Sequence, residues 1–228
     1  MDGPDSDTTD AELLQALRAG NAWAYERLIR RYNRLLFRAA RGIVNNTEEA
    51  QDVVQETYLR AFVSIENFRG EASLGTWLAR IAINQALVHQ RHLGRRVLWN
   101  DQPGAQEGDM VSELEGPDSP DPQDEALRAE LRQHLVEAVD ALAPIYRTVF
   151  ILRGVEGLSV EDTAVTLGVS TDVVKTRYLR ARALLRGALS PSDPAAATEF
   201  YGFAGSQCDQ TVAWVLAQLR NRGVIRDH

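Results

Sequence analysis

The sequence predicts an all-α fold with two helical domains. Apolar residues recur at helical spacing along most of the 228 residues, and no stretch shows the convincing alternation of a strand. Between Arg96 and Arg128 the chain is acidic, lacks lysine and arginine, and is rich in proline and glycine, as is typical of a flexible linker. A second proline- and serine-rich break follows Gly187. The expected parts are a first domain at 1–97, the acidic linker at 98–125, a second domain at 126–188 and a short helical C-terminal extension at 189–228.

Composition narrows the class of protein. With 44% apolar residues, 25% charged residues and a net charge of −7, the chain is ordinary for a globular protein. It has no apolar run long enough for a membrane span and its N-terminus is acidic, so we expect a cytoplasmic protein without membrane insertion. Cys208 is the only cysteine, which excludes an internal disulfide and a cysteine cluster for a metal. His89 and His92 could form half of a metal site, but no third ligand is near, so no metal or cofactor is expected.

Capping residues indicate where the helices of the first domain begin and end. Thr9 and Glu12 have the spacing of a capping box, and Gly20 ends that first helix. The other helices expected here are 22–32 capped by Asn21, 34–44, 48–65 capped by Thr47, and 76–93 ended by Gly94.

The second domain is expected to contain a helix-turn-helix. A helix over 124–142 and another that Pro144 opens come first. Ser159 then caps a short helix, Gly168 permits a tight turn, and Ser170 or Thr171 caps a second helix. The order of small, apolar, glycine, apolar and capping residues at this turn is typical of DNA-binding helix-turn-helix motifs.

The second helix of this motif has a basic outer side. At about 100° per residue, one stripe should pack inward: Val174, Tyr178, Ala181 and Leu185. The outward side is expected to carry Thr176, Leu179, Arg180 and Ala183, with Lys175, Arg182 and Arg186 on one flank and Arg177 near the other. Flanking cations can meet phosphates while central residues reach base edges in a major groove. The alternative is a solvated basic face without a partner.

Two helices of the first domain offer further surfaces. The helix at 48–65 should bury Val54, Tyr58, Ala61, Phe62 and Ile65, and it should expose Asp52, Gln55, Glu56 and Arg60. That polar face alone could be ordinary surface. A glycine-containing loop with Phe68 then leads into the helix of Trp77, which becomes basic toward its end. Loop, aromatic residues and basic helix together suggest single-stranded nucleic acid, whereas Phe68 and Trp77 could also be simple core residues.

Three segments of the sequence resemble those of a known family. The segments "DVVQETYLRAF", "FRGEASLGTWLARIAINQALVHQRHLGRR" and "YRTVFILRGVEGLSVEDTAVTLGVSTDVVKTRYLRARALLRG" look like those of bacterial RNA polymerase sigma factors of the sigma-70 superfamily, extracytoplasmic-function group. The resemblance covers about 21–97 and 126–188, in the family's order. It implies a transcription initiation factor, not an enzyme, with region 2-like and region 4-like domains.

The resemblance also implies partners and residues. The chain would bind core RNA polymerase at its β′ clamp helices and β flap. It would bind promoter DNA at the −10 and −35 elements. An anti-sigma factor is a further candidate partner. Clamp binding would use Asp52, Gln55, Glu56 and Arg60. Melted −10 DNA would be held by Phe68, Arg69, Ser73, Trp77, Asn84, Arg91, Arg95 and Arg96, with a flipped base captured in the loop 68–76. The −35 duplex would be read by Lys175, Thr176, Arg177, Leu179 and Arg180, although family members usually have a bulkier or more basic residue where Leu179 stands.

Competing interpretations remain open from the sequence. A stand-alone helix-turn-helix regulator is the main rival, and a nucleic-acid-processing enzyme is disfavoured because no carboxylate cluster, phosphate loop or activated nucleophile is present. The extension has an apolar stripe at Val212, Val215, Leu216 and Leu219. We expect it to pack on the second domain as added core, with a regulatory segment docked on either domain as the alternative. Cys208 fits an inert thiol better than a redox sensor.

Overall fold

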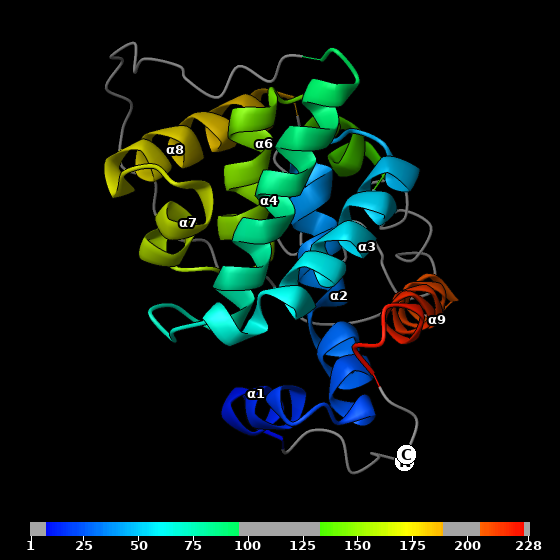
Figure 1. The fold of residues 1–228 in the computed structure, drawn as a ribbon. Coiled ribbons are helices and arrows are strands. Elements are labelled where there is room, and N and C mark those ends of the chain that lie inside the picture. Colours follow the sequence, from blue (N-terminus) through cyan, green and yellow to red (C-terminus); the bar gives the residue numbers. More distant parts are fainter. Residues whose placement is uncertain (1–7, 96–132, 189–205, 226–228) are drawn as a thin grey trace, which may run out of the picture. The chain divides into compact units, whose positions relative to one another are not determined.

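The structure is a computed structural model, and it describes residues 8–95, 133–188 and 206–225. Within these ranges all regular structure is helical, as predicted (Figure 1). The chain divides into two compact units, Met1–Leu93 with Phe203–His228, and Gly94–Gly202. We call them the N-terminal unit and the helix-turn-helix unit. The predicted linker at 98–125 lies outside the described residues.

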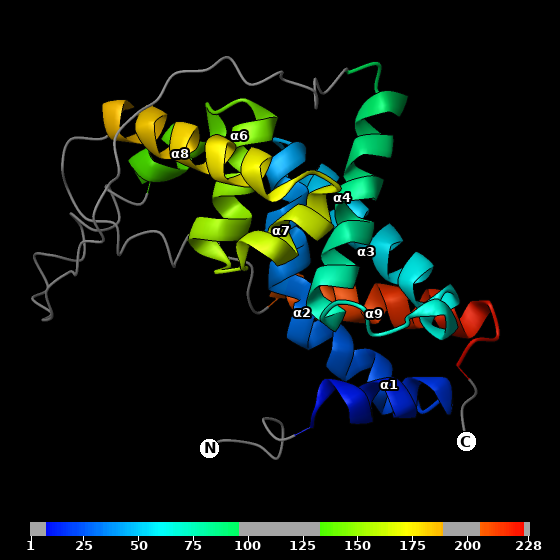
Figure 2. The ribbon, with the colours of Figure 1, turned by 90° about the vertical axis from the view of Figure 1, so that its left-hand side faces the viewer.

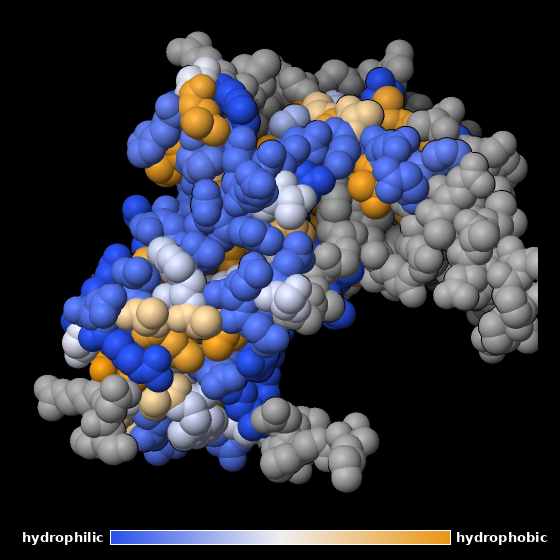
Figure 3. Space-filling view, turned by 90° about the vertical axis from the view of Figure 1, so that its right-hand side faces the viewer, coloured by the Kyte–Doolittle hydropathy of each residue, from blue (hydrophilic) through white to orange (hydrophobic). Residues whose placement is uncertain are grey.

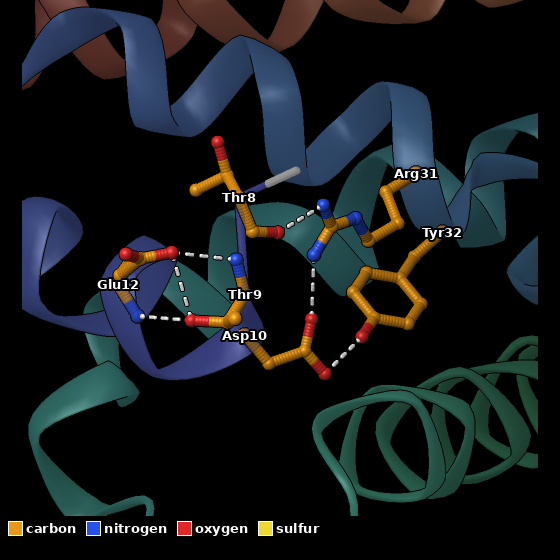
Figure 4. Close-up of polar contacts among 6 residues, drawn as sticks. All are labelled: Thr8, Thr9, Asp10, Glu12, Arg31 and Tyr32. Atoms are coloured by element: carbon orange, nitrogen blue, oxygen red, sulfur yellow. Dashed lines mark hydrogen bonds and ion pairs between the residues drawn. The ribbon is translucent and has the colours of Figure 1, made fainter. Parts of the chain in front are cut away.

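The N-terminal unit begins with two helices joined by a tight turn. α1 (Asp10–Arg18) is followed after the left-handed Gly20 by α2 (Ala22–Ile43). The predicted capping box is present: the Glu12 amide donates to Thr9 Oγ1 at 3.3 Å, and the Thr9 amide donates to Glu12 Oε2 at 2.7 Å. This bonding lowers the pKa of the Glu12 carboxyl. The Asp10 carboxylate accepts from Arg31 at 2.8 Å and from the Tyr32 hydroxyl at 2.5 Å, which attaches α1 to α2 (Figure 4).

The core of this unit lies between α2, α3 and α4. α3 (Thr47–Val63) continues into the short 3-10 helix η1 (Ile65–Asn67), and α4 (Leu74–His92) follows a loop. α2 is one helix of 22 residues, so the prediction of separate helices at 22–32 and 34–44 was wrong. No helix breaker stands between these stretches. The cap of α3 also differs, because Asn46, and not Thr47, accepts the bond from the Glu49 amide.

The C-terminal helix α9 (Ser206–Asn221) packs against α2 and α3, side by side with them in both ribbon views (Figure 1 and Figure 2). The expectation that the extension packs on the second domain was therefore wrong. Most of the predicted apolar stripe turns inward: Val212, Val215 and Leu219 are buried, whereas Leu216 is half-buried. The reason for the different partner is that α2 and α3 offer the apolar surface that this stripe covers.

The helix-turn-helix unit starts with a helical stretch over 133–140, which is the described part of the helix expected at 124–142. α6 (Pro144–Phe150) begins with proline, as predicted, and runs on as the π-helical segment η2 (Ile151–Val155). α7 (Val160–Leu167) and α8 (Thr171–Ala188) complete the unit. α8 packs against both α6 and α7, so these helices fix its orientation within the unit.

Candidate DNA-binding and polymerase-binding surfaces

The turn between α7 and α8 has the geometry that its residues dictate. Ser159 accepts a bond from the Asp162 amide at 2.9 Å and so caps α7. Gly168 ends α7 with φ 65° and ψ 36°, the left-handed conformation that glycine adopts without a steric penalty. Ser170 then accepts a bond from the Val173 amide at 3.4 Å. Of the two predicted caps for α8, Ser170 is the one whose side chain bonds in the structure.

The outward face of α8 carries most of the residues predicted for it. Lys175, Thr176, Leu179 and Arg180 are exposed, Leu179 to 48%. Opposite them, Val174, Ala181 and Leu185 are buried against the unit. This arrangement puts two cations, a hydroxyl and an apolar side chain on one accessible helix surface.

Two residues of α8 differ from the expectation. Arg177, expected near the outer flank, is only 6% exposed, whereas Tyr178, expected to be fully inward, is half-buried. Arg177 lies three residues after Val174 and four before Ala181, so it shares the inward side of the helix. Its aliphatic stem can lie along apolar surface there. The placement of Arg177 does not suit direct contact with DNA.

Tyr178 anchors a small cationic cluster. Its ring stacks on Phe150 with centroids 6.4 Å apart, and the guanidinium carbons of Arg153 and Arg182 lie 5.7 and 5.8 Å from its centroid. Cations near an aromatic face are attracted to its ring quadrupole. Arg153 also donates to the Leu158 carbonyl in the connection to α7. This cluster therefore ties α8 to α6, η2 and the start of the motif.

α4 displays the predicted single-strand-binding residues on one side. Trp77, Asn84 and Arg91 follow each other at seven-residue spacing, and Asn84 and Arg91 are exposed. Arg80 lies on the same stripe and is exposed, although it was not among the candidate residues. Its spacing of three from Trp77 and four from Asn84 was the signal that could have included it. Arg95 is exposed just beyond the helix, and Arg96 lies outside the described residues.

The loop before α4 is short and partly ordered by hydrogen bonds. It spans 68–73, because α4 begins at Leu74 and Thr76 is buried in it. Ser73 caps α4 by accepting from the Thr76 amide at 3.1 Å, and Arg69 is exposed. The loop is therefore shorter than the predicted 68–76.

Phe68 and Trp77 are neither free pocket residues nor full core residues. Both are half-buried, and their rings are tilted against each other with centroids 5.3 Å apart. Arg18 of α1 donates to the Phe68 carbonyl at 3.1 Å and pairs with Glu66 at 3.7 Å. Arg18 is not among the predicted site residues, because no local pattern links it to a loop fifty residues away.

The polar face of α3 is present as expected. Asp52, Glu56 and Arg60 are exposed, Gln55 is half-buried, and Arg60 Nε bonds Glu56 Oε1 at 2.9 Å. The predicted inward stripe is buried, from Val54 to Ile65. An unforeseen feature is Val63, which is 68% exposed at the end of the same face.

The described residues show neither a candidate metal centre nor a membrane-spanning helix. Across the described ranges, no group of three or more His, Cys, Asp or Glu side chains could hold a metal ion. Nor does any helix in the part of the chain that the structure describes combine the length and the apolar character needed to cross a bilayer.

Comparisons with known proteins give these surfaces a context. Residues 28–96 match the family "Sigma-70 region 2", and residues 132–185 match the family "Sigma-70, region 4". The first match contains the α3 face and α4, and the second contains the helix-turn-helix. The two matches define the class of protein, one built from sigma-70 regions 2 and 4.

Relatives and solved structures narrow the class further. The chain is 33% identical over 187 residues to the RNA polymerase sigma-H factor of Pseudomonas aeruginosa, covering 80% of this chain and 94% of the relative. It is also 33% identical over 189 residues to the ECF RNA polymerase sigma-E factor of Haemophilus influenzae, covering 80% and 96%. The chain therefore belongs to the extracytoplasmic-function group of the sigma-70 family and is an RNA polymerase sigma factor. Such factors are transcription initiation factors and not enzymes.

Similar folds occur in two solved complexes. CnrH in complex with the cytosolic domain of CnrY has a TM-score of 0.54 at 26% identity, with 78% of this chain and 95% of that one covered. The sigma factor RpoE of Bartonella quintana, in complex with the anti-sigma factor NepR, has a TM-score of 0.50 at 26% identity, with 80% and 97% covered. The helix α9 lies beyond the stretch that matches region 4, which ends at residue 185.

Proposed function

We propose that this sigma factor directs core RNA polymerase to promoters by reading the −35 duplex with α8 and melted −10 DNA with α4. The observation that carries the proposal is the outward face of α8, where Lys175, Thr176, Leu179 and Arg180 are accessible together. Thr176 and Arg180 are the candidates for base edges, and Leu179 can contact a thymine methyl group. Lys175 is the candidate for a contact with a DNA phosphate. Arg177 supports the helix from inside the unit.

The −10 element is assigned to α4 and the preceding loop. The stripe of Trp77, Arg80, Asn84 and Arg91 supports a path for a single strand along α4, with its backbone near the arginines and a base near the Phe68–Trp77 pair. Arg69 and Ser73 lie in the loop, and Arg95 and Arg96 extend the positive charge. Flipping a base out of the stack costs least when the base is already single-stranded. A base of the melted −10 strand can therefore be captured by the loop at low cost.

The protein partners follow from the family. The exposed face of α3, with Asp52, Gln55, Glu56 and Arg60, is assigned to the β′ clamp helices, and the helix-turn-helix unit to the β flap. The structures with CnrY and NepR support an anti-sigma factor as a further partner. These assignments place the protein in the cytoplasm, where RNA polymerase acts.

Transcription by the reconstituted holoenzyme tests the −35 assignment. Templates with every −35 base varied are transcribed with the wild type, Arg180→Ala, Thr176→Ala and Lys175→Ala. We expect Arg180→Ala to relax selection at one or two −35 positions by about 1–3 kcal/mol. Lys175→Ala should weaken all templates about equally and reduce the salt dependence. If the −35 preferences of Arg180→Ala and Thr176→Ala both equal those of the wild type, α8 does not read this element.

A further inference from the structure

The helix α9 has a second face that the fold does not use. Its inward stripe of Val212, Val215 and Leu219 is buried and accounts for docking on α2 and α3. Trp214 points elsewhere and is 39% exposed, with the small exposed residues Ala213 and Ala217 beside it on the outward side. On the helix surface its neighbours three and four residues away include Gln210, Ala217 and Gln218, so the indole is partly accessible among one small and two polar side chains. Figure 3 views the side on which α9 lies in Figure 1, and it shows apolar side chains gathered at lower left among hydrophilic ones.

Two polar contacts with α2 hold α9 in a defined position, and a third contact, within α2, supports one of them. Arg30 of α2 bonds Asp209 at 2.7 Å and Glu26 at 2.9 Å, and these two carboxylates raise the pKa of the Arg30 guanidinium. The Asn33 amide donates to the Cys208 thiol at 3.3 Å. These contacts anchor the first turn of α9, while the apolar stripe anchors the rest. The outward face, Trp214 included, is therefore presented on a fixed element of the N-terminal unit.

The docked helix leaves the proposed polymerase-binding face open. With α9 in place, Asp52, Glu56 and Arg60 of α3 remain exposed. α9 packs directly on α3, and its Cys208 lies close enough to contribute to the raised pKa of buried Tyr58 in that helix. The geometry does not make α9 a cover for the α3 face. It places a second helix beside that face in the same unit.

We propose that the outward face of α9, centred on Trp214, extends the surface with which this sigma factor binds core RNA polymerase. The inference rests on the proposed function of α3. Around the exposed Trp214 lie Gln210, Ala217 and Gln218, and Arg220 and Arg222 are exposed at the helix end. This face therefore has an apolar centre with a polar rim, as protein interfaces do. Tryptophan is also the residue type most enriched among those that dominate binding energies. The proposed occupant of this face is core RNA polymerase, at the part next to the one that binds α3.

Affinity for core polymerase tests the proposal in the full-length protein. The test variants are Trp214→Ala, which removes the indole, and Ala217→Glu, which adds a charge to the outward face without removing any packing. The matched controls are Trp23→Ala and Ala22→Glu, at exposed positions in the first turn of α2, where Trp23 is 50% exposed. We expect each test variant to weaken the dissociation constant about tenfold or more and each control to leave it within about twofold. Hydrogen exchange of the α9 amides reports whether the helix stays docked.

Each outcome decides one question. If Ala217→Glu binds as tightly as the wild type, or if either test variant binds more tightly, α9 does not add to the polymerase surface. If Trp214→Ala weakens binding only because α9 loses its exchange protection, Ala217→Glu decides, because its side chain stands on the solvent side. If the wild type does not bind core polymerase, the proposed function itself fails. Binding by the wild type with unchanged test variants overturns this inference alone.

Discussion

Replacing Gly168 should destabilise the helix-turn-helix by an amount set almost entirely by backbone conformation. The residue has φ 65°, and a Cβ built at this position meets no atom within 4 Å. Alanine therefore introduces no clash with a neighbour, and its cost is that of an L-residue in the left-handed region, about 1–2 kcal/mol. A change of that size lowers the ratio of folded to unfolded molecules about 5- to 30-fold. Asparagine tolerates this conformation better, and a β-branched residue tolerates it worse.

Hydrogen exchange measured by mass spectrometry can localise this effect in the full-length protein. We expect exchange of the protected α7 and α8 amides to speed up in the order Gly168→Asn, Gly168→Ala, Gly168→Val. The amides of α2 and α3 serve as the internal control, because they belong to the other unit. Transcription that depends on a −35 element should fall in the same order. Equal protection in all three variants would refute the argument, since it would mean that the turn does not require the left-handed conformation.

Two further predictions concern the N-terminal unit. Leu219→Ala removes a fully buried side chain of α9, so we expect it to lower the stability of this unit by about 2–5 kcal/mol while α7 and α8 keep their exchange protection; loss confined to the helix-turn-helix unit would contradict the packing of α9. Burial raises the pKa of the Tyr58 phenol in the folded protein. The neutral phenol therefore contributes fully to folding stability below the pKa of the unfolded state, about 10, and this contribution is lost as the pH rises through the pKa of the folded state. The free energy of unfolding, measured with urea between pH 8 and 11, should therefore fall more steeply with pH for the wild type than for Tyr58→Phe. Parallel curves of this free energy against pH would contradict the prediction.

Local signals were sufficient to predict much of the fold. The capping box at Thr9 and Glu12, the proline at the start of α6 and the Ser159 cap each act within one helical turn, so their effect can be read from neighbouring residues. The same holds for the outward face of α8, where periodicity alone separates Thr176 and Arg180 from the buried stripe.

What the sequence could not supply depends on contacts between distant segments. α9 presents an apolar stripe, but nothing in that stripe says which helices it meets. The choice of α2 and α3 depends on residues far away in the sequence, such as Arg30, which bonds Asp209 179 residues later. Arg177 shows a related limit of reasoning by residue type. A charged residue is expected outside, yet its position between Val174 and Ala181 directs it inward. The contact of Arg18 with the loop at Phe68 likewise has no local signal.

The central claim is that this chain confers promoter recognition on core RNA polymerase. The most direct measurement is transcription in vitro by core polymerase, with and without the full-length protein, from a library of genomic fragments, with the transcript starts mapped. The account predicts a stable complex with core polymerase. It also predicts transcripts that appear only with the protein and begin downstream of shared −35 and −10 sequences. No stable complex, or starts without any shared upstream sequence, would contradict it.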